Sequence, residues 1–221
     1  YFLAGILGTF AAVGLATSFD EARIYINPGH GGWGSNDRNL QTINHAMGDT
    51  TGFYETNTNL LKCLELYHDL EDFGAAEVML SRTKNGISDD CEIDGVPQLV
   101  TLSVICEDVE ANNIDYFISV HSNAATEGST TNYPLVLYRG TDDAVGNGLV
   151  DAKNMGIAAW PFINDNGITF KSHYTKPTDC NVRGDMTFMG GSSTTMGYTG
   201  YYGVLRHGAD GYLIEGCFHT Y

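Results

Sequence analysis

Three side chains that can bind metals or transfer protons occur where apolar stretches of this chain end. His30 follows the stretch IYINPG, and His121 directly follows IDYFISV. Glycines on both sides of His30 allow a tight turn that leaves its imidazole uncrowded. Glu215 lies in YLIEGCF, where a carboxylate among apolar residues is costly to bury unless it is paired or functional. These three residues are therefore candidates for one functional site.

Glu55 is a fourth candidate, at the beginning of a predicted helix in FYETNTNLL. Two imidazoles and a carboxylate form the His₂Glu set that holds a catalytic zinc ion and leaves one position for water. A further carboxylate that does not bind the metal would take the proton from that water. Each residue alone also has a structural explanation, since strand-end histidines are commonly hydrogen-bonded and a negative charge favours a helix N-terminus. Together the four residues supply one group for each role in a zinc hydrolase.

Alternating strands and helices are predicted to position these residues. Apolar and β-branched stretches predict strands at 22–27, 76–82, 114–121, 133–140 and 211–218, and helical spacing predicts helices at 54–73, 99–109 and 149–163. We expect the last helix to break at Pro161 and residues 164–203 to be mostly loop. This alternation indicates an α/β fold, a three-layer sandwich with a mostly parallel or mixed twisted sheet between helices. Ligands of such sheets bind beyond the carboxyl ends of the strands.

Composition limits the classes of partner. The chain of 221 residues is long enough for one domain with a substantial core. Lys and Arg number 11 and Asp and Glu 27, so the formal net charge is −16. A polyanion would be repelled by this charge, which makes nucleic acid and anionic membrane surfaces poor partners.

The N-terminal stretch YFLAGILGTFAAVGLA is apolar but too short and glycine-rich for a membrane span. It resembles the apolar region of a secretory signal, with small residues before a cleavage site at Thr17. We therefore expect residues 1–18 to be a signal-peptide remnant and the protein to be exported to the periplasm, cell envelope or extracellular space. Residues 19–221 would form the catalytic domain, without stable membrane insertion once the signal is removed. A buried N-terminal helix is the alternative.

The five cysteines lie far apart and form no C-x-x-C pair, which argues against a cysteine zinc site. Their odd number leaves at least one thiol unpaired within the chain. Cys63 and Cys106 lie on apolar faces of predicted helices and are expected to be small core residues.

Several short motifs occur in order along the chain: NPGHGG, YETNTNLL, VMLSR, SVHSNAA, GVLR and LIEGCF. In this order they resemble the motifs of the zinc-dependent N-acetylmuramoyl-L-alanine amidases of the type-3 family, which cut bacterial cell walls. The resemblance runs from about Arg23 to the end of the chain. The chain departs from the family pattern at Asn27, where the family has Asp, and at Gly216, since the family's glycine comes one residue later.

The resemblance implies a zinc ion held by His30, Glu55 and His121, with Glu215 as the catalytic base. It implies hydrolysis of the amide between N-acetylmuramic acid and L-alanine, with peptidoglycan as the partner and residues 19–221 as the zinc amidase domain. Because the family usually has a helix after the last strand, the resemblance also implies that the sequence is the front part of a longer protein. Arg206 in GVLR is a candidate substrate or structural contact. A zinc carboxypeptidase acting on wall peptides and a non-catalytic peptidoglycan-binding module are the alternatives. A monomer is the default expectation.

Overall fold

A six-stranded sheet forms the centre of the fold, with the strand order β2-β1-β3-β6-β4-β5. The computed structural model describes residues 19–30, 55–83, 101–123, 132–142, 149–164, 182–189 and 202–218. The strands are β1 (Arg23–Pro28), β2 (Glu77–Leu80), β3 (Tyr116–Asn123), β4 (Leu135–Tyr138), β5 (Val182–Gly184) and β6 (Asp210–Phe218). Strands β2, β1, β3 and β6 run parallel, whereas β4 pairs antiparallel with β6 and parallel with β5. The prediction of a mixed, mostly parallel sheet is confirmed.

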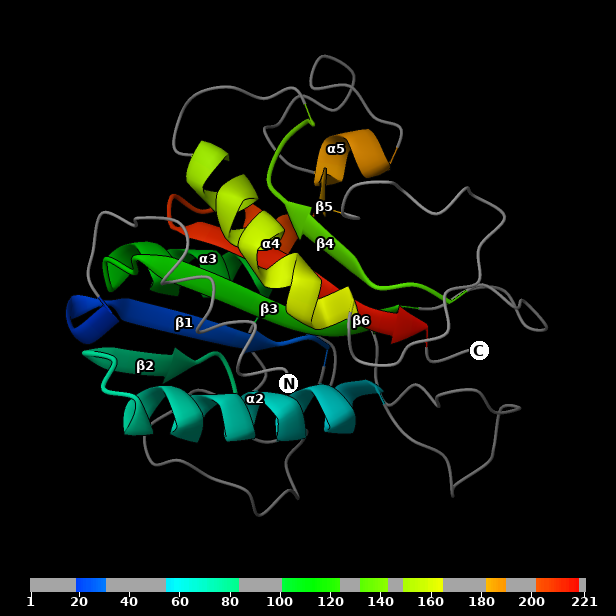
Figure 1. Ribbon diagram of the computed structural model, residues 1–221. Helices are drawn as coiled ribbons and strands as arrows, with labels where there is room; N and C mark the ends of the chain where they lie inside the picture. Colours follow the sequence, from blue (N-terminus) through cyan, green and yellow to red (C-terminus); the bar gives the residue numbers. More distant parts are fainter. Residues whose placement is uncertain are drawn as a thin grey trace.

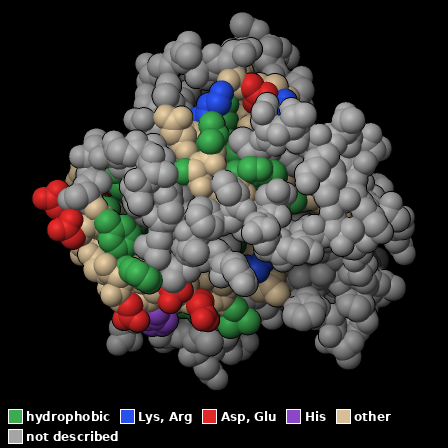
Figure 2. Space-filling view, viewed as in Figure 1, with side chains coloured by type: hydrophobic (Ala, Val, Ile, Leu, Met, Phe, Trp, Pro, Cys, Tyr) green, Lys and Arg blue, Asp and Glu red, His purple; other side chains and the backbone are tan. Residues whose placement is uncertain are grey.

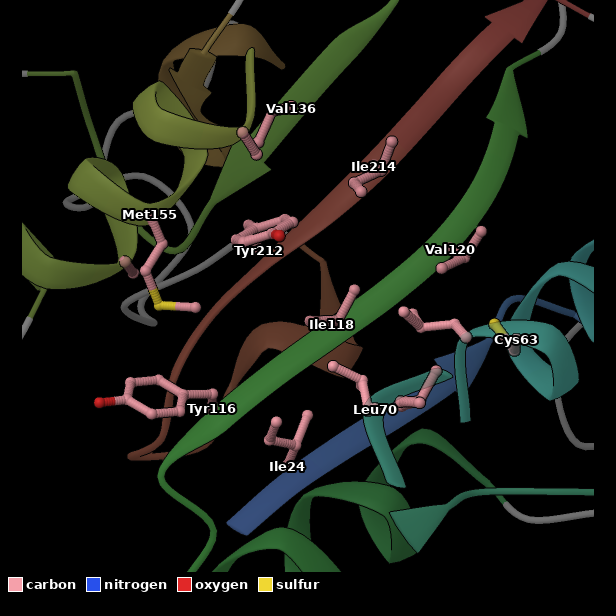
Figure 3. Close-up of a cluster of buried hydrophobic side chains, with 14 of the residues drawn as sticks. Ile24, Cys63, Leu70, Tyr116, Ile118, Val120, Val136, Met155, Tyr212 and Ile214 are labelled. Atoms are coloured by element: carbon pink, nitrogen blue, oxygen red, sulfur yellow. The ribbon is translucent and has the colours of Figure 1, made fainter. Parts of the chain in front are cut away.

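Helices α2 (Glu55–Asp72) and α4 (Leu149–Asn164) cover one face of the sheet. In Figure 1, α4 crosses in front of the sheet and α2 runs along its lower edge, below β2. Figure 3 shows Leu70 from α2 and Met155 from α4 among the strand side chains of this face, including Ile118 of β3. All three are fully buried, and burial of such a side chain contributes about 1.5–3 kcal/mol.

Helix α3 (Leu102–Ala111) and the short η2 (Gly203–Leu205) cover the opposite face. Ile105 and Val109 of α3 pack against alternate residues of the same strands, such as Phe117 of β3. Because successive strand side chains point to opposite faces, a strand buried on both faces is apolar almost throughout. The predicted three-layer arrangement is therefore confirmed.

Local sequence explains where two helices begin and end. The Thr101 hydroxyl accepts the Val104 N–H and caps the start of α3. Gly74 follows α2 with φ 90, a left-handed conformation that glycine adopts without strain. The remaining short elements are η1 (Phe19–Glu21) and α5 (Asp185–Phe188).

Two predictions about the second half of the chain need correction. Helix α4 does not break at Pro161 but continues to Asn164. A proline removes only one helical hydrogen bond, to the carbonyl of residue 157, and the exposed position of Ile157 leaves that side of the helix open to water. Within residues 164–203, β5 and α5 form an edge of the fold where we expected mostly loop.

The outward side of α2 is acidic, with Glu65, Glu71 and Asp72 exposed. Figure 2 shows Asp and Glu side chains gathered at the lower edge of the molecule, where α2 lies. Among the described helices, none combines the length and apolar character needed to cross a membrane. The predicted signal-peptide remnant at 1–18 lies outside the described residues.

Candidate metal centre

The turn after β1 presents His30 at the carboxyl edge of the sheet. Pro28 is the last residue of β1, and Gly29 follows it with its N–H donated to the Val120 carbonyl at 2.9 Å. His30 then adopts a left-handed conformation with φ 57. Because β1 and β3 are parallel and paired, this turn lies beside His121 near the end of β3.

Gly29 allows the two histidines to approach each other. A Cβ atom at position 29 would lie 2.3 Å from both Cε1 and Nε2 of His121, far inside van der Waals contact. The His30 and His121 rings lie 4.9 Å apart between centroids, with an interplanar angle of 80°. The packing of His121 therefore requires a glycine at position 29, the first glycine of the NPGHGG motif.

Glu55 is the first residue of α2 and its carboxylate lies between the two imidazoles. Its Oε1 atom is 3.4 Å from His30 Nε2 and 3.6 Å from His121 Nδ1. The Ser122 backbone N–H donates to the same oxygen at 3.1 Å, which fixes the carboxylate at the end of β3. Among the described residues, His30, Glu55 and His121 form the group whose ligand atoms, all within 4.8 Å of one another, could hold a metal ion.

The surroundings favour the protonation states that metal binding needs. Burial acts to raise the pKa of Glu55, but hydrogen bonds from His121 and His30 outweigh it and hold that pKa below its ordinary value. Burial lowers the pKa of His121, although the hydrogen bond to Glu55 acts to raise it. An ionised carboxylate and a neutral imidazole are the forms that act as metal ligands.

The donor set fits a catalytic zinc ion. Two imidazole nitrogens and one carboxylate oxygen are zinc ligands, and three protein ligands leave a fourth position for water or substrate. The side chains of His30 and His121 are each 14% exposed and that of Glu55 is 2% exposed. The cluster is thus mostly buried but still open to solvent on the side of the histidines.

Glu215 lies next to this cluster without belonging to it. In the register of β3 and β6, His121 pairs with Glu215, so the two residues lie on adjacent parallel strands. Glu215 is 7% exposed and is not one of the three clustered residues. Glu215 therefore places a carboxylate beside the candidate metal site.

Arg206 is not brought to the cluster. It is exposed and follows η2, on the face of the sheet that α3 covers. The Arg206 charge acts on Cys106 in the middle of α3, whereas Glu55 begins α2 on the other face. Its role as a substrate contact stays a prediction.

Comparison with known proteins assigns the chain to a family. Residues 24–183 match the family model described as N-acetylmuramoyl-L-alanine amidase. The chain belongs to this family. No curated protein shows a significant match to the sequence.

Solved amidase structures have a similar fold. The N-acetylmuramoyl-L-alanine amidase from Clostridium difficile 630 is 19% identical with a TM-score of 0.59, over 91% of this chain and 82% of that one. Ami1 from Mycobacterium smegmatis is 14% identical with a TM-score of 0.57, over 92% of this chain and 85% of that one. The catalytic domain of CwlV from Bacillus (Paenibacillus) polymyxa var. colistinus is 20% identical with a TM-score of 0.52, over 90% and 82%. At these identities the similarity establishes the fold.

Membership of the family defines the reaction that the cluster serves. This amidase acts on peptidoglycan, at the N-acetylmuramoyl-L-alanine amide, as the motifs predicted. The His30–Glu55–His121 triad is consistent with the zinc site of the family. The family match ends at residue 183, so it does not reach Arg206 or Glu215, whose roles stay predictions.

At Asn27 the amidase departs from the family motif, in which an aspartate stands at this position. In the structure the Asn27 side chain is buried and binds Ser81 at 2.8 Å and Ser119 at 2.7 Å. It therefore connects β1 to both neighbouring strands.

Two buried residues beside the amidase site were not predicted as functional. Arg82 ends the VMLSR motif, and Asn59 lies one helical turn after Glu55. Both side chains donate hydrogen bonds to the Gly29 carbonyl. Sequence offered one signal for each: a charged residue directly after an apolar strand, and an amide four residues after a candidate ligand.

Proposed function

We propose that this amidase hydrolyses its substrate with a zinc ion held by His30, Glu55 and His121 and with Glu215 as general base. The observation that carries the proposal is the His30–Glu55–His121 cluster at the carboxyl edge of the sheet, with Glu215 paired to His121 in the strand register. A binding module would have no need of this set of groups.

When bound, zinc lowers the pKa of water and polarises the scissile carbonyl. Glu215 accepts the proton of the attacking water and delivers it to the amine of L-alanine as the C–N bond breaks. Its low exposure limits competing contacts with bulk water. Glu55 and the two imidazoles stay in place during the reaction, because the Ser122 N–H and the Gly29 turn hold them.

The carboxypeptidase alternative uses the same ligand set but needs a positive group that binds a terminal carboxylate. The match to the amidase family favours cleavage between the sugar and the peptide. Product analysis separates the two activities, since the amidase releases peptides with a free L-alanine amino terminus.

The domain limits and the location of the protein belong to the same proposal. Residues 19–221 form the catalytic domain, and the apolar stretch within 1–18 directs export to the cell wall, where peptidoglycan lies. Amino-terminal sequencing of the mature protein from the producing cells tests this, and a mature protein that retains residues 1–18 would contradict it.

Two glutamine variants test the assignment of the carboxylates. The wild-type protein should carry about one zinc ion per chain. Glu55→Gln should lose most of the zinc, because an amide oxygen is a much weaker ligand than a carboxylate. Glu215→Gln should keep the zinc and the fold but lose ~10²–10⁴ in rate, since an amide cannot accept the proton. Zinc content and release of L-alanine amino termini from peptidoglycan are the measurements.

The outcomes separate the roles clearly. Full activity in Glu215→Gln, or zinc loss equal to that of Glu55→Gln, would overturn the assignment of Glu215 as the base. A wild-type protein that takes up no zinc at micromolar concentration would overturn the assignment of the metal site.

A further inference from the structure

The turn that presents His30 is held in an unfavourable conformation. His30 has φ 57, and for residues other than glycine the left-handed region costs roughly 1–2 kcal/mol. Such a conformation persists only where surrounding contacts impose it. The Gly29 N–H already binds the Val120 carbonyl, so the contacts of the Gly29 carbonyl decide how firmly the turn is fixed.

Arg82 holds this turn from the side of β2. It is 1% exposed and is the largest of the fully buried side chains that the structure describes. Its Nε donates to the Pro28 carbonyl and its Nη2 to the Gly29 carbonyl, each at 3.1 Å. A buried guanidinium is costly unless it is hydrogen-bonded, and these bonds go to the two carbonyls that directly precede His30.

Asn59 holds the same carbonyl from the side of α2. Its Nδ2 donates to the Gly29 carbonyl at 3.3 Å and lies 3.5 Å from Glu55 Oε1. The side chain is fully buried. The Gly29 carbonyl is therefore bound by donors from two different elements, one of which also carries Glu55.

We propose that Arg82 and Asn59 are positioning residues that fix the Gly29 carbonyl and thereby set the metal affinity of His30. The inference rests on the proposed role of His30 as a zinc ligand. Neither residue belongs to the metal-binding cluster. Arg82 acts through the backbone of the turn, whereas Asn59 acts through that backbone and through its contact with Glu55 Oε1. A ligand must be held within ~10–20° of its productive geometry, and free rotation of the Gly29–His30 peptide would exceed that.

Zinc affinity measured by competition with a chromophoric chelator tests the proposal. Arg82→Met, which removes both donors but keeps an apolar stem, should weaken zinc binding by ~10–100-fold. Arg82→Lys should lie between Met and wild type, since one ammonium cannot span both carbonyls in the fixed geometry of a guanidinium. Asn59→Ala should weaken binding less than Arg82→Met. The double variant should lose less than the product of the single effects, because both side chains bind one carbonyl.

The absorption spectrum of the cobalt-loaded protein provides a second readout, because it reports ligand geometry and not global stability. It should change in Arg82→Met and stay unchanged in two controls. Arg23→Met removes an exposed arginine that binds Glu77 at the other end of β1. Leu70→Ala removes a buried side chain near the far end of α2 and lowers stability without touching Gly29.

The proposal would be overturned if folded Arg82→Met bound zinc within twofold of the wild-type affinity and kept an unchanged cobalt spectrum. The proposed function would still stand in that case if the wild-type protein binds zinc and is active. If Arg82→Met does not fold, Arg82→Lys decides by the same criterion, because Asn59→Ala also removes the contact with Glu55. A wild-type protein without zinc affinity would overturn both the proposed function and this inference.

Discussion

Gly29 shows at the scale of one residue how packing limits the sequence of the site. Its N–H and carbonyl groups are both hydrogen-bonded, and its α-carbon faces the His121 ring. Any Cβ atom there would lie 2.3 Å from His121 ring atoms. Either the His121 ring or the turn that presents His30 must then move, and both histidines are proposed zinc ligands.

We therefore expect Gly29→Ala to lower zinc affinity by about tenfold or more while the protein still folds. Gly74→Ala is the matched control, because Gly74 has φ 90 and no atom within 4 Å of an added Cβ. The control should lose roughly 1–2 kcal/mol of unfolding free energy through backbone strain alone. Chelator competition and urea unfolding measure the two effects. Equal zinc affinities in the two variants would contradict the packing argument.

Asn27 acts at the scale of strands, because its side chain joins β1 to β2 through Ser81 and to β3 through Ser119. All three side chains are buried. A buried polar group that loses its partner costs about 1–3 kcal/mol. We expect Asn27→Ala to lower the unfolding free energy of the metal-free protein by this order, as measured by urea denaturation.

A triple variant provides the control for Asn27. Changing Ser81 and Ser119 to alanine together with Asn27 removes the amide and also the two hydroxyl groups that bind it. Much of the lost stability should return, because no unpaired polar group is then left behind. A triple variant less stable than Asn27→Ala would show that the hydroxyl groups contribute through other contacts.

The individual elements could be predicted because their signals are local. The apolar runs before His30 and His121 placed both residues near strand ends, and the helix start placed Glu55 at the N-terminus of α2. The neighbourhood of His121 and Glu215 could not be predicted from spacing, since it depends on β6 lying beside β3. The three residues of β5 are too few to show a strand pattern.

Arg82 and Asn59 escaped prediction for a related physical reason. Both donate hydrogen bonds to the carbonyl of Gly29, which lies 53 residues before Arg82 and 30 before Asn59 in the chain. An interaction with a backbone carbonyl leaves no trace in the residue type of its partner. Such positioning contacts can be found only once the fold brings the segments together.

At the scale of the whole molecule, both faces of the sheet hold buried polar groups. Glu55 and Asn59 lie on α2, which covers one face. The face covered by α3 holds the Tyr25 hydroxyl, which donates to Asp108 at 2.8 Å, and the buried His207. His207 packs on Phe117, four residues before His121 along β3, and so lies away from the metal-binding cluster. We infer that the buried His207 contributes to how the fold responds to acid.

Burial and the nearby Arg139 charge lower the pKa of His207 from 6.5 to about 4. Between these values the unfolded chain binds a proton that the folded protein does not, so stability falls as the pH drops from 6.5 towards 4. His207→Leu removes this loss and should be about 2 kcal/mol more stable relative to wild type at pH 5 than at pH 8. Urea denaturation of the metal-free proteins at both pH values measures the difference, since the remaining titratable groups are common to both proteins and cancel. If the His207→Leu variant has the same pH dependence as wild type, then His207 accepts a proton equally well in the folded and in the unfolded protein, and the prediction is wrong.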